Sequence, residues 1–204
     1  MNRLLVATTN LAKLREYRIL LRDFPLFLVS LRDVGIADSP IEDGKTFAEN
    51  ALIKARFYFA RSQMPTLADD GGLEIDACGG APGVLSHRWL GDAESGDESL
   101  VKEVMRRMAG VELERRTARL KAAVALLYRR GSSVVEERIA EAALDGIIPL
   151  RAHPSVRPGF PYRSVLFVPA LDRYVVELGE EAEAAISQRK IALEQLSGAL
   201  RVLA

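Results

Sequence analysis

The chain has 204 residues, with 28 basic and 28 acidic side chains and a formal net charge of zero. A chain of this length can bury a sizeable core, so we expect one domain over residues 1–204, with room for two lobes. The balanced charge gives no reason to expect a nucleic acid partner, and any phosphate binding must be local.

Cysteine content and hydropathy limit the kinds of site and the cellular location that we expect. Cys78 has no second thiol for a disulfide or a zinc site, so we expect a small packed side chain. The longest later apolar run, residues 122–128, is far below the roughly 18 residues that a membrane-spanning helix needs. We therefore expect a soluble, cytoplasmic protein with no membrane partner.

The first third of the chain alternates strand and helix patterns. Residues 3–7 predict a short buried strand, and apolar residues over 14–24 recur at helical spacing. Residues 26–29 predict a second strand, and the turn-rich stretch 35–46 after it predicts an accessible loop.

A capped helix follows this loop. Thr46 with Glu49 three positions later matches the capping-box pattern. The expected buried stripe leaves Glu49, Asn50 and Lys54 outside it and consists of Ala48, Ala51, Leu52, Ala55 and Phe59. In the next stretch, residues 66–76 (TLADDGGLEID), an apolar lead predicts a strand that ends at two aspartates and a sharp Gly-Gly turn.

The remaining elements complete an α/β pattern. Residues 97–110 predict an amphipathic helix closed by a glycine. Residues 117–130 and 132–144 predict strands joined by a turn at 129–133, although alanines leave the first compatible with a helix. Residues 179–203 predict a helix with a break near Ser197 and Gly198, and this order of elements indicates an α/β architecture.

The segment ATTNLAKLRE, residues 7–16, is the first candidate site. A strand that ends in small polar side chains before a helix offers N–H donors at the positive helix end, which suits phosphate oxygens, and Lys13 adds a full charge. Alternatively, Asn10 only caps the helix and Lys13 forms a solvated pair with Glu16. The glycines of a Walker loop are missing.

The acidic residues Asp69 and Asp70, with Glu42 from the loop, form the second candidate site. Mg²⁺ often takes one or two carboxylates plus substrate phosphates, and adjacent aspartates could divide metal binding from water activation. The alternative is a plain Asx-turn in the Asp-Asp-Gly-Gly stretch.

Two further stretches have weaker patterns. Residues 79–83 combine three glycines and a proline, which is typical of loops that approach a ligand closely. These residues open the stretch 79–91, in which His87 is better interpreted as a packed or surface histidine than as a proton carrier. Phe160 and Tyr162 could stack on a nucleobase or belong to the core, and Arg189 could read phosphate or lie exposed on a helix.

These pieces together, in this order, closely resemble the inosine triphosphate pyrophosphatase family. The resemblance covers nearly the whole chain and depends on VATTNLAKLRE, TFAENALIKA, LADDGGLEIDACGGAPGVLSHRWLG, GFPY and ISQR. It implies hydrolysis of noncanonical purine nucleoside triphosphates to a monophosphate and pyrophosphate, with Mg²⁺ as the cofactor. It also implies an elongated mixed β-sheet flanked by helices, two lobes around a central cleft, and a homodimer.

The resemblance also implies residue roles. Glu42 and Asp70 would bind metal, Asp70 would activate water, and Asp69 would support that catalytic site. The implied substrate-binding residues are Thr8, Thr9, Asn10, Lys13, Lys54, Gly71, Phe160, Tyr162, Arg163, Gln188 and Arg189.

The chain departs from the family pattern mainly where the base would be read. Arg163 stands in place of an acid, Glu183 in place of a lysine, and Gln188 in place of a histidine, while Pro161 and Gly71 replace a glycine and a serine. We therefore expect a pyrophosphohydrolase of altered or relaxed base preference. A nucleotide sensor without turnover is the alternative, a purely structural partner is less favoured, and the roles of His87 and His153 stay open.

Overall fold

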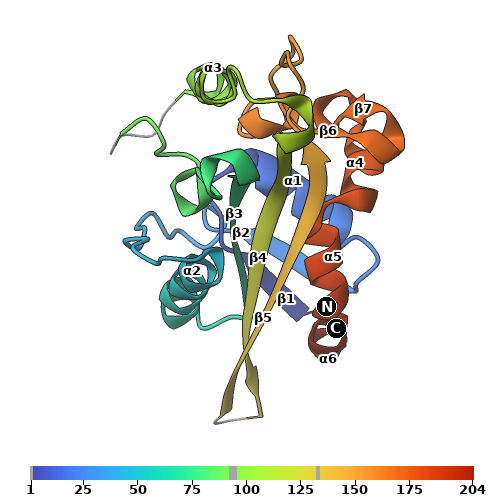
Figure 1. Ribbon diagram of the computed structural model, residues 1–204. Helices are drawn as coiled ribbons and strands as arrows, with labels where there is room; N and C mark the ends of the chain where they lie inside the picture. The colour runs from blue at the N-terminus through green and yellow to red at the C-terminus, as the bar shows by residue number, and fades with distance from the viewer. Residues whose placement is uncertain (1, 92–95, 132–133) are drawn as a thin grey trace. The chain divides into compact units, whose positions relative to one another are not determined.

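The computed structural model describes residues 2–91, 96–131 and 134–204 (Figure 1). The chain forms two compact units. The first unit comprises Met1–Asp70, Ala122–Ala142 and Gln188–Ala204, and the second comprises Gly71–Lys121 and Ala143–Ser187.

One mixed sheet has the strand order β2-β1-β3-β4-β5-β6-β7, and Figure 1 shows β3, β4 and β5 running side by side. β1 pairs in parallel with β2 and β3, whereas β5, β6 and β7 pair antiparallel. This confirms the predicted α/β class with a mixed sheet. The strands are β1 (Asn2–Val6), β2 (Leu26–Ser30), β3 (Thr66–Ile75), β4 (Thr117–Arg130), β5 (Val134–Ile147), β6 (Phe167–Val168) and β7 (Arg173–Tyr174).

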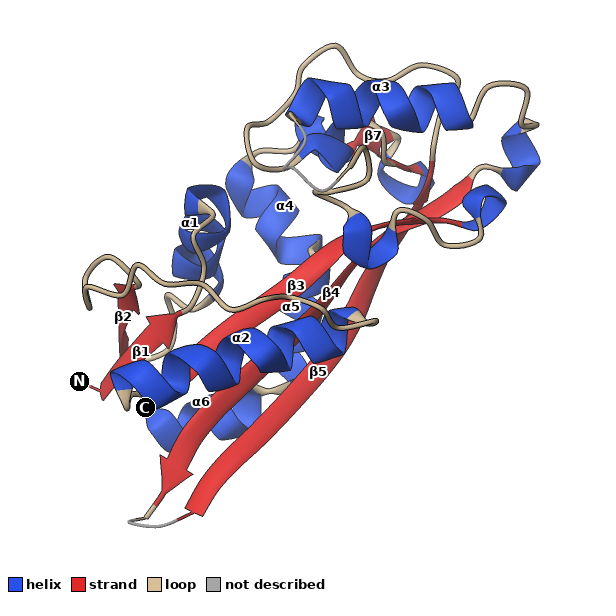
Figure 2. Cartoon of the chain, turned by 90° about the vertical axis from the view of Figure 1, so that its left-hand side faces the viewer, coloured by secondary structure: helices blue, strands red, loops and turns tan. Residues whose placement is uncertain are grey.

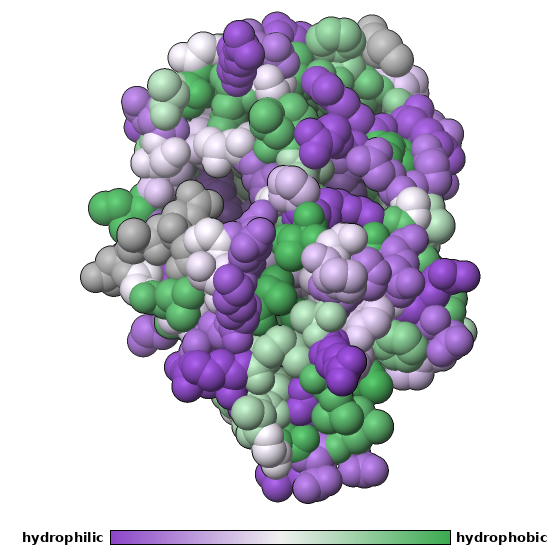
Figure 3. Space-filling view, turned by 90° about the horizontal axis from the view of Figure 1, so that it is seen from above, coloured by the Kyte–Doolittle hydropathy of each residue, from purple (hydrophilic) through white to green (hydrophobic). Residues whose placement is uncertain are grey.

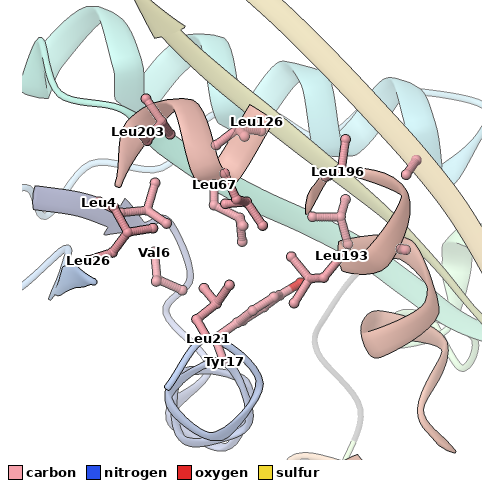
Figure 4. Packing of buried hydrophobic residues seen from close by; sticks show 14 of the residues in the cluster. Leu4, Val6, Tyr17, Leu21, Leu26, Leu67, Leu126, Leu193, Leu196 and Leu203 are labelled. Carbon is pink, nitrogen blue, oxygen red and sulfur yellow. The ribbon is translucent and has the colours of Figure 1, made fainter. Parts of the chain in front are cut away.

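Helices of the first unit cover both faces of its part of the sheet. Figure 2 shows α2 in front of the strands and α5 and α6 behind them. Leu14 and Tyr17 of α1 share a buried cluster with Leu193 of α5 and Leu200 of α6, and Figure 4 shows Tyr17 and Leu193 within it. The helices are α1 (Leu11–Leu20), α2 (Phe47–Ser62), α5 (Gln188–Gln195) and α6 (Ser197–Leu203).

The second unit has its own core. Leu100 and Val104 of α3 (Asp97–Arg107) pack with Leu73, Ile148 and Val165, and α4 spans Glu180–Ile186. Single turns of 3₁₀ helix connect its elements at η1 (Asp76–Cys78), η2 (Gly83–Leu85), η3 (Leu113–Arg115), η4 (Pro161–Ser164), η5 (Pro169–Leu171) and η6 (Val175–Glu177).

The predicted Gly-Gly turn after the aspartates is wrong, because β3 continues through it to Ile75. The glycine at position 72 serves close packing instead. A Cβ on Gly72 would lie 1.8 Å from Ser86 Oγ, and that hydroxyl accepts a hydrogen bond from the Leu73 N–H at 3.1 Å. The glycine at position 72 is therefore explained by the lack of space for a side chain, and not by a bend in the backbone.

Most other elements match their predictions. Thr46 caps α2 by accepting from the Glu49 N–H at 3.1 Å, and residues 117–130 form a strand. The C-terminal segment is interrupted at Leu196, directly before Ser197, as predicted, and also at Ser187, where no break was predicted. The predicted hairpin turn includes Ser132 and Ser133, which lie outside the described residues.

The surface mixes polar and apolar residues. Figure 3 shows hydrophilic and hydrophobic residues interspersed over the face that it presents. Among the helices in the described ranges, none is long and apolar enough to cross a bilayer.

Candidate active site

The two adjacent aspartates of β3 have separate sets of partners. Successive side chains of a strand point to opposite faces of a sheet. Asp69 contacts Lys13 of α1 and Arg189 of α5, whereas Asp70 contacts Asn50 and Lys54 of α2. The alternation of the strand thus gives each carboxylate its own cations, which offsets the repulsion between two neighbouring charges.

Two carboxylates converge on the ammonium group of Lys54. Lys54 Nζ lies 2.7 Å from Glu42 Oε2 and 3.4 Å from Asp70 Oδ1. Burial lowers the pKa of Lys54, but Asp70 and Glu42 outweigh that effect and raise the pKa above its ordinary value. A full positive charge is therefore held between a loop acid and a strand acid.

This donor set fits a hard divalent cation. The described residues contain no group of three or more His, Cys, Asp or Glu side chains placed to hold a metal ion. Mg²⁺ commonly uses only one or two carboxylates and completes its shell with water and phosphate oxygens. Glu42 and Asp70, which both contact the Lys54 ammonium group, can supply such a pair.

At the start of α1, Asn10 caps the helix, as the alternative interpretation predicted. Asn10 Oδ1 accepts from the N–H groups of Ala12 and Lys13 at 2.8 and 3.2 Å, and Thr8 Oγ1 accepts from the Asn10 N–H at 3.2 Å. The predicted solvated pair of Lys13 with Glu16 is wrong, because these residues are only 8% and 7% exposed and contact other partners. Lys13 is therefore anchored, and Thr9 is exposed beside it.

Lys13 belongs to a buried network of four charges. Asp69 Oδ2 lies 3.1 Å from Lys13 Nζ and 2.9 Å from Arg189 Nη2, while Arg189 Nη1 lies 3.4 Å from Glu16 Oε2. Two cations and two carboxylates balance one another. Arg189 is 4% exposed, so its interpretation as an exposed helix-face cation is wrong.

Opposing effects set the protonation of this network. Burial raises the pKa of Asp69, but Lys13 and Arg189 outweigh it and hold the pKa well below its ordinary value. Burial lowers the pKa of Lys13, an effect that Asp69 opposes. The pKa of Arg189 is lowered by burial and raised more strongly by Asp69 and Glu16. Asp69 is thus an ionised, inward-facing carboxylate.

The second unit contains the residues that depart from the family pattern. Arg163 and Glu183 form an ion pair, and Arg157 contacts the other oxygen of the same carboxylate. The side chains of Arg163 and Glu183 are 6% and 4% exposed. Arg163 Cζ lies 3.4 Å from the centroid of the Phe160 ring. The two apparent charge reversals in the sequence are therefore partners of each other.

Tyr162 belongs to the core of the second unit, which is the second of the two alternatives that its sequence allowed. It is 4% exposed, packs in the cluster of the second unit, and donates its hydroxyl to the Ser86 carbonyl oxygen. Burial raises the pKa of Tyr162 well above its ordinary value. Phe160 is partly buried, with the Arg163 guanidinium over its ring.

The predicted site residues divide between the two units. The structure brings Glu42, Lys54 and Asp70 together, and Lys13 together with Asp69 and Arg189. The first unit holds Thr8, Thr9, Asn10, Lys13, Glu42, Lys54, Asp69, Asp70, Gln188 and Arg189, and the second holds Gly71, Phe160, Tyr162 and Arg163. The histidines His87 and His153 are both partly buried in the second unit.

Asn50 is the site residue that the sequence prediction missed. It is 1% exposed and donates to Asp70 Oδ2 at 3.1 Å. The predicted stripe excluded it because amides rarely occupy a buried helix face. Its spacing of four residues from Lys54 was the available signal, because such residues share one face of a helix.

This fold and site define an α/β protein in which two adjacent acids in the middle of β3, Asp69 and Asp70, each contact a lysine. A sequence profile of the Ham1 family matches residues 4–199, so the chain belongs to that family, which confirms the resemblance to the inosine triphosphate pyrophosphatases.

Individual relatives match over almost their full length. The chain is 36% identical to the dITP/XTP pyrophosphatase of Escherichia coli K12 over 201 residues, covering 98% of this chain and 99% of the relative. It is 37% identical to that of Xanthomonas campestris over 203 residues, covering 100% and 99%. A HAM1 protein from Coxiella burnetii has a similar structure, with a TM-score of 0.82, 33% identity and 98% coverage of both chains.

Proposed function

We propose that this protein is a Mg²⁺-dependent pyrophosphohydrolase of noncanonical purine nucleoside triphosphates. Its reaction adds one water molecule between the α and β phosphates and gives a nucleoside monophosphate and pyrophosphate. The relatives that carry the name dITP/XTP pyrophosphatase and align over the whole chain support this activity.

One observation carries the proposal. Glu42 and Asp70, from a loop and a strand, share the ammonium group of Lys54 at 2.7 and 3.4 Å. Two carboxylates that lie close together beside a lysine suit the binding of a metal cation and a polyphosphate chain at one site. A bound Mg²⁺ would neutralise phosphate charge during the displacement.

We assign the protein groups as follows. Asp70 takes a proton from the attacking water, and Glu42 and Asp70 supply the oxygen ligands for the metal. Lys54, Lys13 and the Thr8–Asn10 segment hold phosphate oxygens. Asp69 supports the reaction from the opposite face by holding Lys13, from which it lies 3.1 Å away.

The base-reading end is the basis for the proposed change in specificity. We assign Phe160 and Arg163 of the second unit to it, together with Glu183, the partner of Arg163. The buried Arg163–Glu183 pair supports an altered preference, because the donors and acceptors that it could offer to a base differ from those of the acid and lysine in the family pattern.

A substrate panel tests the proposal. Pyrophosphate release is measured with Mg²⁺ for ITP, XTP, dITP, the common nucleoside triphosphates and modified pyrimidine triphosphates. We expect release from at least one purine, and its loss in Asp70→Asn with nucleotide binding retained. If the protein binds a nucleotide but releases pyrophosphate from no member of the panel, the proposed enzyme is wrong and the nucleotide sensor takes its place. Full turnover by Asp70→Asn would remove Asp70 as the base.

A further inference from the structure

Asn50 uses both polar atoms of its buried side chain to join two parts of the candidate site. Its Oδ1 accepts from the Gly44 N–H at 2.8 Å, and its Nδ2 donates to Asp70 Oδ2 at 3.1 Å. The residue is 1% exposed, and an unpaired amide at that depth would cost free energy. One neutral side chain therefore ties the loop before α2 to strand β3.

The loop approaches Asn50 so closely that only glycine fits at position 44. A Cβ on Gly44 would lie 2.6 Å from Asn50 Oδ1 and 2.8 Å from Glu49 Cβ. Gly44 follows Glu42 by two residues, so this contact sets where the acidic loop lies. The absence of a side chain at Gly44 is thus part of the same arrangement.

Lys54, one helical turn after Asn50, contacts the same loop and the same strand. The two oxygens of Asp70 are shared out between these neighbours, since Oδ2 faces the Asn50 amide and Oδ1 faces the Lys54 ammonium at 3.4 Å. The roles of the two side chains differ in charge. The Lys54 ammonium attracts a phosphate by charge, whereas the Asn50 amide carries no charge and binds only through hydrogen bonds.

We infer that Asn50 is a positioning residue, which fixes the Asp70 carboxylate and the Glu42 loop in their working arrangement through its contacts with Asp70 and Gly44. This inference rests on the proposed roles of Glu42 and Asp70. It adds a neutral partner that touches no substrate, and its effect on the reaction is transmitted through the two acids.

The test compares Asn50→Ala with Thr46→Ala. Both changes lie at the start of α2, but Thr46 only caps the helix through the Glu49 N–H and contacts neither acid. We expect Asn50→Ala to lower kcat by about 10- to 100-fold, with the nucleotide KM changed less than about threefold. Binding of Mn²⁺ without nucleotide should weaken by about tenfold. Thr46→Ala should lower thermal stability and leave kcat and Mn²⁺ binding unchanged.

The outcomes separate this inference from the proposed function. Wild-type kcat and wild-type Mn²⁺ affinity in Asn50→Ala would overturn the role of Asn50 and leave the hydrolase intact. Absence of turnover in the wild type would overturn the hydrolase, while Mn²⁺ affinity would still test Asn50. If Asn50→Ala does not fold, amide exchange of wild-type Gly44 decides. Protection supports its bond to Asn50, and exchange at the rate of an unprotected loop amide contradicts it.

Discussion

Asp69 and Asp70 lie next to each other in β3 but have different surroundings. The Asp69 side chain is 1% exposed and bonded to Lys13 and Arg189, whereas the Asp70 side chain is 15% exposed and faces Lys54. A buried, fully ionised carboxylate suits the holding of cations. The more accessible Asp70 is the better placed of the two to meet water and a metal ion.

The environment of Asp69 predicts a pH-dependent stability. Its pKa in the folded protein lies below the unfolded value of about 3.9, despite the opposing effect of burial. Asp69 therefore stabilises the fold fully above the unfolded pKa, and this contribution is lost as pH falls toward the folded pKa. Asp69→Asn should reduce the free energy of unfolding at neutral pH by about 3 kcal/mol and flatten its decline below about pH 4.

Denaturant unfolding between about pH 3 and about pH 7 checks this prediction. Asp38→Asn is the matched control, since the Asp38 side chain is 75% exposed, and it should change stability by less than about 0.5 kcal/mol. Parallel pH profiles for the wild type and Asp69→Asn would contradict the assignment.

At the scale of elements, β3 organises the site because its two faces meet different helices. α2 brings Asn50 and Lys54 to Asp70, and α1 and α5 bring Lys13 and Arg189 to Asp69. Each of these three helices therefore contributes one cation to the site. A one-residue shift in the register of β3 would turn both aspartates to the opposite faces of the sheet, so the register with Leu5 opposite Thr66 keeps each one beside its own cations.

In the second unit, η4 and α4 are joined by a buried ion pair whose reversal can be tested. Arg163→Glu leaves two acids beside Arg157, and Glu183→Arg leaves three guanidinium groups together. Each single change should cost about 3–5 kcal/mol, and the double variant Arg163→Glu/Glu183→Arg should recover part of that loss. Chemical denaturation measures the cycle.

The same reversal at Arg56 and Glu137 serves as the control. That pair is bidentate but 58% and 36% exposed, so its reversal should change stability by less than about 1 kcal/mol. Strictly additive effects at Arg163 and Glu183 would show that the two residues are not energetically coupled. A substrate panel on the double variant then reports whether the polarity of the pair affects base preference.

At the scale of the whole molecule, the family resemblance predicts a homodimer of a 22.4 kDa chain. A formal net charge of zero means that long-range repulsion does not oppose association of two copies. Light scattering after size exclusion should therefore give about twice the chain mass. A mass equal to one chain at micromolar concentration would contradict the prediction. The cytoplasmic location and the cleft between two lobes also stay predictions.

Much of the fold could be predicted because it depends on local patterns. Apolar runs and helical spacing located strands β1 to β5 and the long helices, and Thr46 marked the start of α2, whereas the two-residue strands β6 and β7 were not predicted. The Gly-Gly stretch misled the prediction, since glycine favours turns and also allows close packing, and only the position of Ser86 tells the two apart. Asn50 was misplaced for a similar reason, because its partners lie 6 and 20 residues away.

The sequence by itself determined the class of fold and the family, and it supplied the candidate residues for phosphate and metal binding, since these follow from residue type, order and spacing. Only the tertiary structure decided which charges are partners. It separated Asp69 from Asp70, buried Arg189 against Asp69, and paired Arg163 with Glu183. The physical reason is that Coulomb and hydrogen-bond energies depend on distance and burial in space, and neither quantity can be read from separation along the chain.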